Sequence, residues 1–273
     1  MKITTRWGCL VGMILGVAAA NGAAAPRKGV RLENLTWIEA EQVLRPETVV
    51  VIPLGAAAKE HGPHLRLNND WLMAEYLTRE VLARADVVVA PTVNYHFYPA
   101  FVNYPGSTSL RLETARDLMV DICRSLARHG PRKFYVLNTG VSTVRALIPA
   151  EEILAKEGII LRHTDILHVA EAVEKEVLKQ EGGTHADEGE TSMMLVIAPE
   201  TVDMSKAVKD FHENKPGPLT RDPNGAGTYS PTGVWGDATL ATREKGEKIV
   251  RATVEGTLRE IEALRAEALP AKP

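Results

Sequence analysis

The sequence predicts an α/β protein in which helices cover both faces of a mostly parallel sheet. Two observations lead to this prediction. Apolar runs alternate along the chain with amphipathic runs, and the apolar runs are continuous rather than alternating in polarity. Strands that are buried on both faces have such continuous apolar sequences, and strands that alternate with helices favour parallel pairing.

Each expected element follows from one of these runs. Three apolar runs predict buried strands, and a weaker run predicts a fourth: "TVVVIPL" (48–54), "ADVVVAPTV" (85–93), "RKFYVLNTG" (132–140) and "GIILRHTDIL" (158–167). Amphipathic patterns predict helices at 71–84, 111–129, 142–157, 168–182 and 237–267. The second of these helices is expected to stop at Gly130 and Pro131.

The segment 201–235 fits neither pattern. It is rich in proline, glycine and asparagine, which predicts a long irregular stretch rather than a linker, since the chain after it must still pack. Long loops inside compact domains are often functional. Trp235, near its end, is interpreted either as a cover for a ligand crevice or as a packing anchor.

The N-terminus resembles a targeting segment. "MKITTR" is a short basic region, "WGCLVGMILGVAAA" is apolar, and "NGAAAP" offers small residues for cleavage, the layout of a secretory signal peptide. A membrane anchor is the alternative, but the apolar run is shorter than the roughly 20 residues of a spanning helix. We expect a signal peptide at 1–24, one domain at 25–273, no stable membrane anchor after cleavage, and a periplasmic or secreted product.

Net charge and cysteine content bear on two further properties, nucleic-acid binding and disulfide bonding. The formal net charge is −3, and no run of like charges resembles a nucleic-acid patch, so nucleic-acid binding is not expected. Cleavage after Ala24 would remove Cys9 and leave Cys123 as the one cysteine. No internal disulfide could then form, and Cys123 is expected to be a small core hydrophobe.

The stretch "GAAAKEHGPHLRLNND" (55–70) directly follows an expected strand. In parallel α/β sheets, ligands bind beyond the carboxyl ends of the strands. His61 and Asp70 would therefore reach a crevice, and their side chains suit Zn²⁺ or Mn²⁺.

A second cluster of this kind is "THADEGETSMML", which holds His185, Asp187, Glu188 and Glu190 before an apolar helical run. Acids at this point can cap a helix, with Thr184 or Asp187 as the N-cap. Glu190 could equally face a cation, and the spacing alone favours neither interpretation.

Several blocks in order resemble the creatininase family of metal-dependent amidohydrolases. "PLGAAAKEHGPHLRLNND" is similar to the family's "PxGSxEQHGPHLPLxTD", and "HADEGETSMML" is similar to "HAGExETSxML". "NYPGSTSL", "DICRSLARHGPRKFYVLNTG" and "TREKGEKI" resemble further blocks, so the similarity spans about 35 to 260. The resemblance implies a three-layer α/β/α sandwich and a two-metal site at which an activated water attacks a carbonyl carbon.

The resemblance implies roles for four residues. His61, Asp70 and Glu190 fall on family metal ligands, with Asp70 at the bridging position. His185 falls on the histidine that transfers protons. A divalent ion, Zn²⁺ or Mn²⁺, is therefore the expected cofactor, held firmly at one of the two family sites.

The residues for the second ion are incomplete. Lys59 stands where the family has a ligand glutamate, and Glu60 is displaced by one position, so that only a changed turn could make Glu60 a second-site ligand. Val141 replaces a ligand histidine, and Thr143 replaces a glutamate that assists the catalytic water. Valine cannot bind a metal, and threonine is a poor proton carrier.

Other residues are candidates for substrate binding. His96 follows the second strand and is expected to reach the crevice, as a stand-in ligand, a substrate-facing group or a surface histidine. Ser107, in "PGSTSL", is interpreted as a binding-loop residue, since no GxSxG motif surrounds it. Lys59 is either a solvated lysine or a group whose ammonium takes the place of the missing metal charge.

Two hypotheses follow. The first is an exported hydrolase that cleaves a C–N amide bond of a small, cyclic or formamide-like substrate, with His185 as acid/base. The second is a protein whose site has decayed and which binds a small molecule or a partner. The family resemblance also implies a homo-oligomer. The departures at Val141 and Thr143 argue against creatinine itself as the substrate.

Overall fold

A computed structural model of the chain describes residues 29–270. Its central sheet has five strands in the order β1-β3-β2-β4-β5, and every pair is parallel. The strands are β1 (Val30–Arg31), β2 (Val49–Leu54), β3 (Val88–Val89), β4 (Lys133–Asn138) and β5 (Ile160–His163). The expected parallel α/β sheet is confirmed, and the signal-peptide prediction for 1–24 lies outside the described residues.

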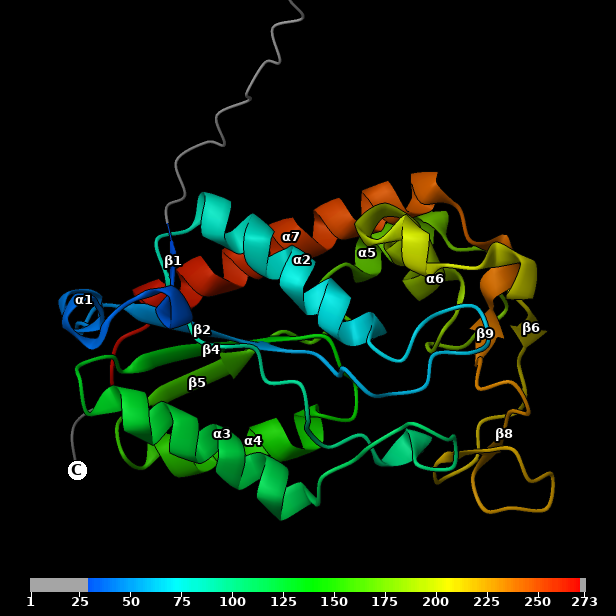
Figure 1. Cartoon of the computed structure of the whole chain (residues 1–273), viewed down its shortest axis with the longest axis horizontal. Coiled ribbons are helices and arrows are strands. Elements are labelled where there is room, and N and C mark those ends of the chain that lie inside the picture. Colours follow the sequence, from blue (N-terminus) through cyan, green and yellow to red (C-terminus); the bar gives the residue numbers. More distant parts are fainter. Residues whose placement is uncertain (1–28, 271–273) are drawn as a thin grey trace, which may run out of the picture.

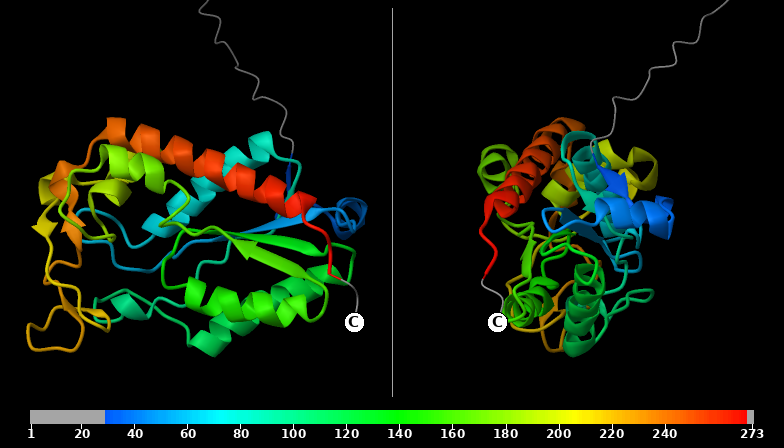
Figure 2. Two further views of the ribbon diagram at one scale, coloured as in Figure 1. Left: turned by 180° about the vertical axis from the view of Figure 1, so that it is seen from behind. Right: turned by 90° about the vertical axis from the view of Figure 1, so that its left-hand side faces the viewer.

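Helices cover both faces of the sheet, as Figures 1 and 2 show. The α-helices are α1 (Trp37–Val43), α2 (Asn69–Arg84), α3 (Leu112–Ala127), α4 (Val144–Ala155), α5 (Glu171–Val177), α6 (Glu188–Ile197) and α7 (Arg243–Ala266). Helices α2, α5, α6 and α7 lie on one face, whereas α3 and α4 lie on the other. The three-layer α/β/α architecture is therefore confirmed.

The helices on both faces of the sheet explain why the strand sequences are continuously apolar. Along β2, Val49 and Val51 pack with α2 and α7, whereas Val50 and Ile52 pack with α3 and α4. Alternate side chains of a strand point to opposite faces, so a strand between two helix layers needs apolar residues at every position. Cys123 is buried in the core beside α4, in agreement with its expected role.

The segment 201–235 is irregular, as predicted. It contains short 3₁₀ helices and two-residue strands: η3 (Pro199–Thr201), η4 (Met204–Lys206), β6 (Lys209–Asp210), β7 (Leu219–Thr220) and β8 (Thr228–Tyr229). The remaining short elements are η1 (Leu32–Asn34), η2 (Pro99–Phe101), β9 (Gly236–Asp237) and η5 (Ala238–Leu240). Strands β6 and β9 pair antiparallel, and β7 and β8 pair parallel, outside the main sheet.

Two of the expected elements are shorter than predicted. The strand expected at 85–93 is reduced to β3, and only an isolated bridge at Val93 continues it. Pro91 lies between them, and proline cannot donate to a strand ladder. The helix expected at 168–182 is the shorter α5, because the amides of Lys179 and Gln180 donate instead to Glu188 Oε2.

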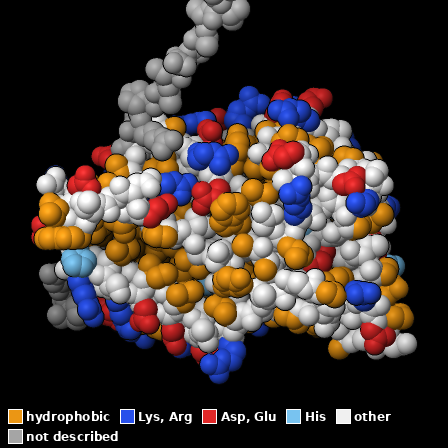
Figure 3. Space-filling view, in the orientation of Figure 1, with side chains coloured by type: hydrophobic (Ala, Val, Ile, Leu, Met, Phe, Trp, Pro, Cys, Tyr) orange, Lys and Arg blue, Asp and Glu red, His pale blue; other side chains and the backbone are white. Residues whose placement is uncertain are grey.

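No helix among residues 29–270 is both long and apolar enough to cross a membrane. Apolar side chains nevertheless gather on the surface near α1, at one end of the view in Figure 3. In this helix, the exposed fraction of the residue surface is 76% for Trp37 and 53% for Ile38.

Candidate metal centre

The expected site lies at the carboxyl ends of β2 and β4, which are neighbours in the sheet. The chain leaves β2 toward α2 on one face and leaves β4 toward α4 on the other, so the two loops diverge around a crevice. A cavity of about 310 Å³ lies there, and its lining includes Lys59, Val141, His185, Glu190 and Trp235.

His61 is buried beside these lining residues, and both of its ring nitrogens have partners. Nε2 lies 2.7 Å from Asp70 Oδ1, and Nδ1 lies 2.9 Å from the carbonyl oxygen of Lys59. A backbone carbonyl on Nδ1 is the usual way in which proteins fix the orientation of a metal-binding histidine. The ring is therefore held with Nε2 directed at the acids.

The acids around His61 also change its protonation. Burial and the charge of Lys59 lower the pKa of His61, but Asp70 and Glu190 outweigh them and raise it to about 9. Both partners of the ring are hydrogen-bond acceptors, so the metal-free ring carries a proton on each nitrogen. A metal ion at Nε2 would displace the proton that the two carboxylates hold there.

Glu190 reaches the same point from the first turn of α6. Its Oε1 lies 3.4 Å from His61 Nε2 and accepts a hydrogen bond of 3.1 Å from Asn69 Nδ2. Burial acts to raise the pKa of Glu190, but the His61 contact and nearby cations outweigh burial and lower it. The side chain is thus an ionised carboxylate directed at His61.

The local fold explains how Glu190 is placed. Asp187 is the N-cap of α6, and its Oδ1 accepts a hydrogen bond of 2.9 Å from the Glu190 amide, which confirms one of the expected caps. Ala186 has a φ of 47°, in the left-handed region that non-glycine residues rarely adopt, and its amide donates to Glu190 Oε2 at 2.7 Å. The sharp turn before α6 thus both starts the helix and holds the carboxylate.

His185 precedes this turn and lies above His61, with ring centroids 5.1 Å apart. Its Nε2 donates to Glu60 Oε2 at 3.1 Å, and its Nδ1 lies 3.9 Å from Glu190 Oε2. The backbone of His185 exchanges two hydrogen bonds with Trp235, of 2.9 and 3.3 Å. Trp235 therefore lines the cavity and anchors His185 as well.

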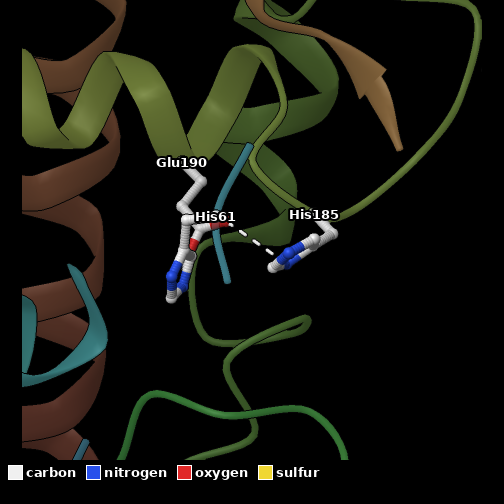
Figure 4. A group of neighbouring side chains, drawn as sticks. All are labelled: His61, His185 and Glu190. Carbon is white, nitrogen blue, oxygen red and sulfur yellow. Dashed lines mark ion pairs between the residues drawn. The ribbon is translucent and has the colours of Figure 1, made fainter. Parts of the chain in front are cut away.

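Three side chains of this site lie close enough together to be candidate donors to one divalent ion. His61, His185 and Glu190 have ligand atoms within 4.8 Å of one another, and their side chains converge in Figure 4. Two atoms that each lie about 2.1 Å from one ion are at most about 4.2 Å apart. The distance of 3.4 Å from His61 Nε2 to Glu190 Oε1 and that of 3.9 Å from His185 Nδ1 to Glu190 Oε2 satisfy this limit, but they end at different oxygens of Glu190. His61 and Glu190 can therefore share one ion, and His185 lies next to them.

Asp70 contacts His61 but is not in that group of three. Its Oδ1 faces His61 Nε2, whereas its Oδ2 lies 2.8 Å from Lys59 Nζ. Burial acts to raise the pKa of Asp70, but Lys59 and His61 outweigh it, and the pKa is lowered. The expected set of His61, Asp70 and Glu190 thus meets around the single atom His61 Nε2.

Both carboxylate oxygens of Glu60, the residue predicted as a second-site ligand, have partners within the protein. Its Oε1 accepts from the Gly62 amide, and its Oε2 accepts from His185 Nε2. Sequence spacing could not fix this direction, because it depends on the turn at Gly62, where φ is 68°. Glu60 instead orients the ring of His185.

The structure places Ser107 and His96, which were predicted to bind substrate, in other surroundings. Neither residue lines the cavity. Ser107 Oγ accepts a hydrogen bond of 2.9 Å from the Glu60 amide, so this side chain holds the metal-site loop. His96 is fully buried and donates from Nε2 to the Ala115 carbonyl at 3.1 Å, so this ring packs against α3.

Two residues of the site were not predicted. The centroid of the Phe101 ring lies 4.3 Å from the centroid of the His185 ring and 4.7 Å from Lys59 Nζ.

His64 is the second of these residues. Its Nε2 lies 2.8 Å from Thr191 Oγ1, and this contact ties the loop after β2 to α6. Burial lowers the pKa of His64 to about 4, so this ring is neutral. The second histidine of "HGPH" was the available signal for this link.

Comparisons with known proteins point to one family. The profile of the family Creatininase, described as creatinine amidohydrolase, matches residues 33–261. Creatinine amidohydrolase of Pseudomonas putida is 28% identical over 250 residues, which cover 84% of this chain and 95% of that protein. Mycofactocin precursor peptide peptidase of Mycolicibacterium smegmatis is 30% identical over 219 residues, covering 76% of this chain and 82% of that protein.

Solved structures show the same likeness. A structure described as "Creatininase Mn" superposes with a TM-score of 0.73 at 27% identity and covers 88% of this chain and 100% of its own. A mutant creatininase described as "Zn-Zn type" superposes with a TM-score of 0.71 at 27% identity and covers 87% of this chain and 98% of its own.

Proposed function

Because the chain belongs to the creatininase family, we propose that it is an exported, metal-dependent hydrolase that cleaves a C–N amide bond of a small substrate. Two of the relatives are named for hydrolysis of C–N bonds, as an amidohydrolase and a peptidase. Cyclic amides and formamides are the substrates to test first. One solved relative carries manganese in its description and another carries zinc, so Zn²⁺ or Mn²⁺ is the proposed cofactor.

One observation carries this proposal. His61 Nε2 is directed at two carboxylates, 2.7 Å from Asp70 Oδ1 and 3.4 Å from Glu190 Oε1, while the other ring nitrogen is tied to the backbone. A bound divalent ion at this point supplies a water of lowered pKa and polarises a carbonyl. His61, Asp70 and Glu190 hold the ion, and Glu190 keeps its charge at neutral pH.

His185 is the proton carrier in this proposal. Its Nδ1 faces the metal centre near Glu190, while its Nε2–H is held by Glu60 Oε2. A carboxylate on one nitrogen fixes the tautomer and stabilises the ring when the other nitrogen takes up a proton. Nδ1 can therefore accept a proton and later deliver it to the leaving nitrogen.

The experiment that tests the proposal combines metal binding with turnover. The protein is loaded with Zn²⁺ or Mn²⁺, freed of excess ion and screened against cyclic amides and formamides. We expect retained metal and hydrolysis, and we expect His61→Ala to lower the retained metal at least tenfold, because that change removes the central donor. His96→Ala is the matched control, since His96 lies outside the cavity, and it should keep its metal. Wild-type protein that retains no ion would refute the proposal.

A further inference from the structure

We propose that the ammonium of Lys59 occupies the place of a second cation, so that the centre binds one divalent ion and no more. This inference rests on the proposed function, since the ion is the one proposed there. The geometry at Asp70 points to it. The two oxygens of this carboxylate serve different partners, with Oδ1 2.7 Å from His61 Nε2 and Oδ2 2.8 Å from Lys59 Nζ.

The surroundings of Lys59 are those of an internal cation and not of a solvated side chain. Lys59 is 4% exposed and Asp70 is fully buried. Nζ lies 4.7 Å from the centroid of the Phe101 ring and 5.8 Å from that of the Tyr98 ring. Aromatic rings at these distances attract a cation, the more so where water is excluded. The carboxylate and the two rings together fix the ammonium at the edge of the cavity.

The residues around this point do not fit a second metal ion. Val141 lines the cavity, but its side chain has no donor atom. Thr143 is fully buried, and its hydroxyl lies 2.7 Å from Asn138 Oδ1 and 2.6 Å from the Gly140 carbonyl, within its own turn. Glu60 is engaged with Gly62 and His185. Asp70 Oδ2 is the ligand that these residues leave, and the ammonium of Lys59 lies 2.8 Å from it as an ion pair.

The ammonium therefore supplies a charge that a two-ion centre would take from solution. It is fixed covalently and needs no metal to be present. It also opposes a second ion directly, because two cations that share one buried carboxylate repel each other at short range. The loop after β4, residues 139–143, holds no histidine, cysteine or carboxylate that could bind a second ion.

Metal stoichiometry of the wild-type protein is the first test. The full protein is loaded with Mn²⁺, freed of excess ion by gel filtration and analysed by mass spectrometry of the metal and by electron paramagnetic resonance. We expect one Mn²⁺ per chain and the six-line spectrum of an isolated ion. Two ions per chain with a spin-coupled spectrum would overturn the inference and leave the proposed function standing. Retention of no ion would refute the proposed function, and this inference with it.

Restoring the missing donors is the second test. Lys59→Glu combined with Val141→His removes the ammonium and offers two ligands, and we expect a second Mn²⁺ per chain with spin coupling. The control is Lys59→Met with Val141→His, which removes the ammonium but offers one ligand, and we expect one ion. If the first variant folds, judged by circular dichroism, and still binds one ion, the assignment of Lys59 is wrong. If it does not fold, the wild-type stoichiometry decides.

Discussion

At the scale of single residues, the metal centre depends on pairs of side chains that orient each other through hydrogen bonds. Glu60 holds the Nε2 of His185 at 3.1 Å, and the Gly62 amide holds the other oxygen of Glu60. His185 keeps Nδ1 on the side of Glu190 as a result. Glu60 is thus a positioning residue, which acts on the reaction through His185 and does not itself contact the proposed ion.

Glu60→Gln is expected to lower kcat by about 10- to 100-fold while leaving metal content and KM nearly unchanged, because a neutral amide orients His185 less firmly and does not stabilise its protonated form. The measurement is steady-state kinetics across pH with metal analysis of the same samples. Glu255→Gln, an exposed change on α7, is the control and should behave as wild type. Loss of the metal along with kcat would instead assign Glu60 to metal binding.

Residue types indicated His61 and Asp70, the family resemblance added Glu190 and His185, and the structure brings these four together. The roles of Glu60, Ser107 and His96 could not be predicted in this way. Each depends on the direction in which a loop turns, and one-residue shifts in a loop reverse such directions. Phe101 was missed for the same reason, since an aromatic residue at the end of η2 carries no signal of the histidine that it contacts.

At the scale of secondary structure, short elements were harder to predict than long ones. Helix α1 was not predicted, although "TWIE" has the pattern of a capping box, in which Thr36 and Glu39 cap each other. Helix α5 is shorter than expected because a buried side chain, Glu188, takes the amides that would have continued beyond it. Tertiary contacts overrode the local pattern in that case.

Helix α5 also brings an acid into the cavity, and this gives a prediction of pH dependence. Burial raises the pKa of Glu174 to about 7, with a further contribution from Asp187. In the unfolded chain the same carboxyl ionises near pH 4.5, so the folded state loses stability as pH rises from about 4.5 to 7. Glu174→Gln removes this loss.

We expect the Glu174→Gln variant to exceed wild type in free energy of unfolding by about 1 to 2 kcal/mol at pH 8, after allowance for screening by solvent, and by much less at pH 4.5. Urea denaturation at the two pH values is the measurement. Glu176→Gln on the exposed side of α5 is the matched control. A difference from wild type that does not change with pH would contradict the assigned pKa.

At the scale of the whole molecule, one parallel sheet positions everything that the proposed chemistry needs. The strand order places β2 between β3 and β4, so the loops after β2 and β4 meet at one edge. This arrangement could be predicted from the apolar runs and from the family resemblance, because both depend on long, regular elements. The packing of residues 201–235 could not, since no periodic pattern constrains that segment.

Export is a prediction about the whole chain. Cleavage after Ala24 should give a mature protein that begins at Ala25, released into the periplasm or the medium. Intact mass and N-terminal sequencing of protein from fractionated bacterial cells measure this directly. A full-length product that starts at Met1 and remains in the membrane fraction would show that the N-terminal segment is an anchor.

The hydrogen-bonded bridge between His185 and Trp235 has a consequence for how the protein is made. Residues far apart along the chain must come together before the proposed proton carrier is held in place, so the centre is completed only when nearly all of the polypeptide has been synthesised and folded. A nascent or truncated product that ends before Trp235 would contain His61, Asp70 and Glu190 yet leave His185 without its backbone partner. Activity should therefore appear during refolding only once Trp235 has paired with His185.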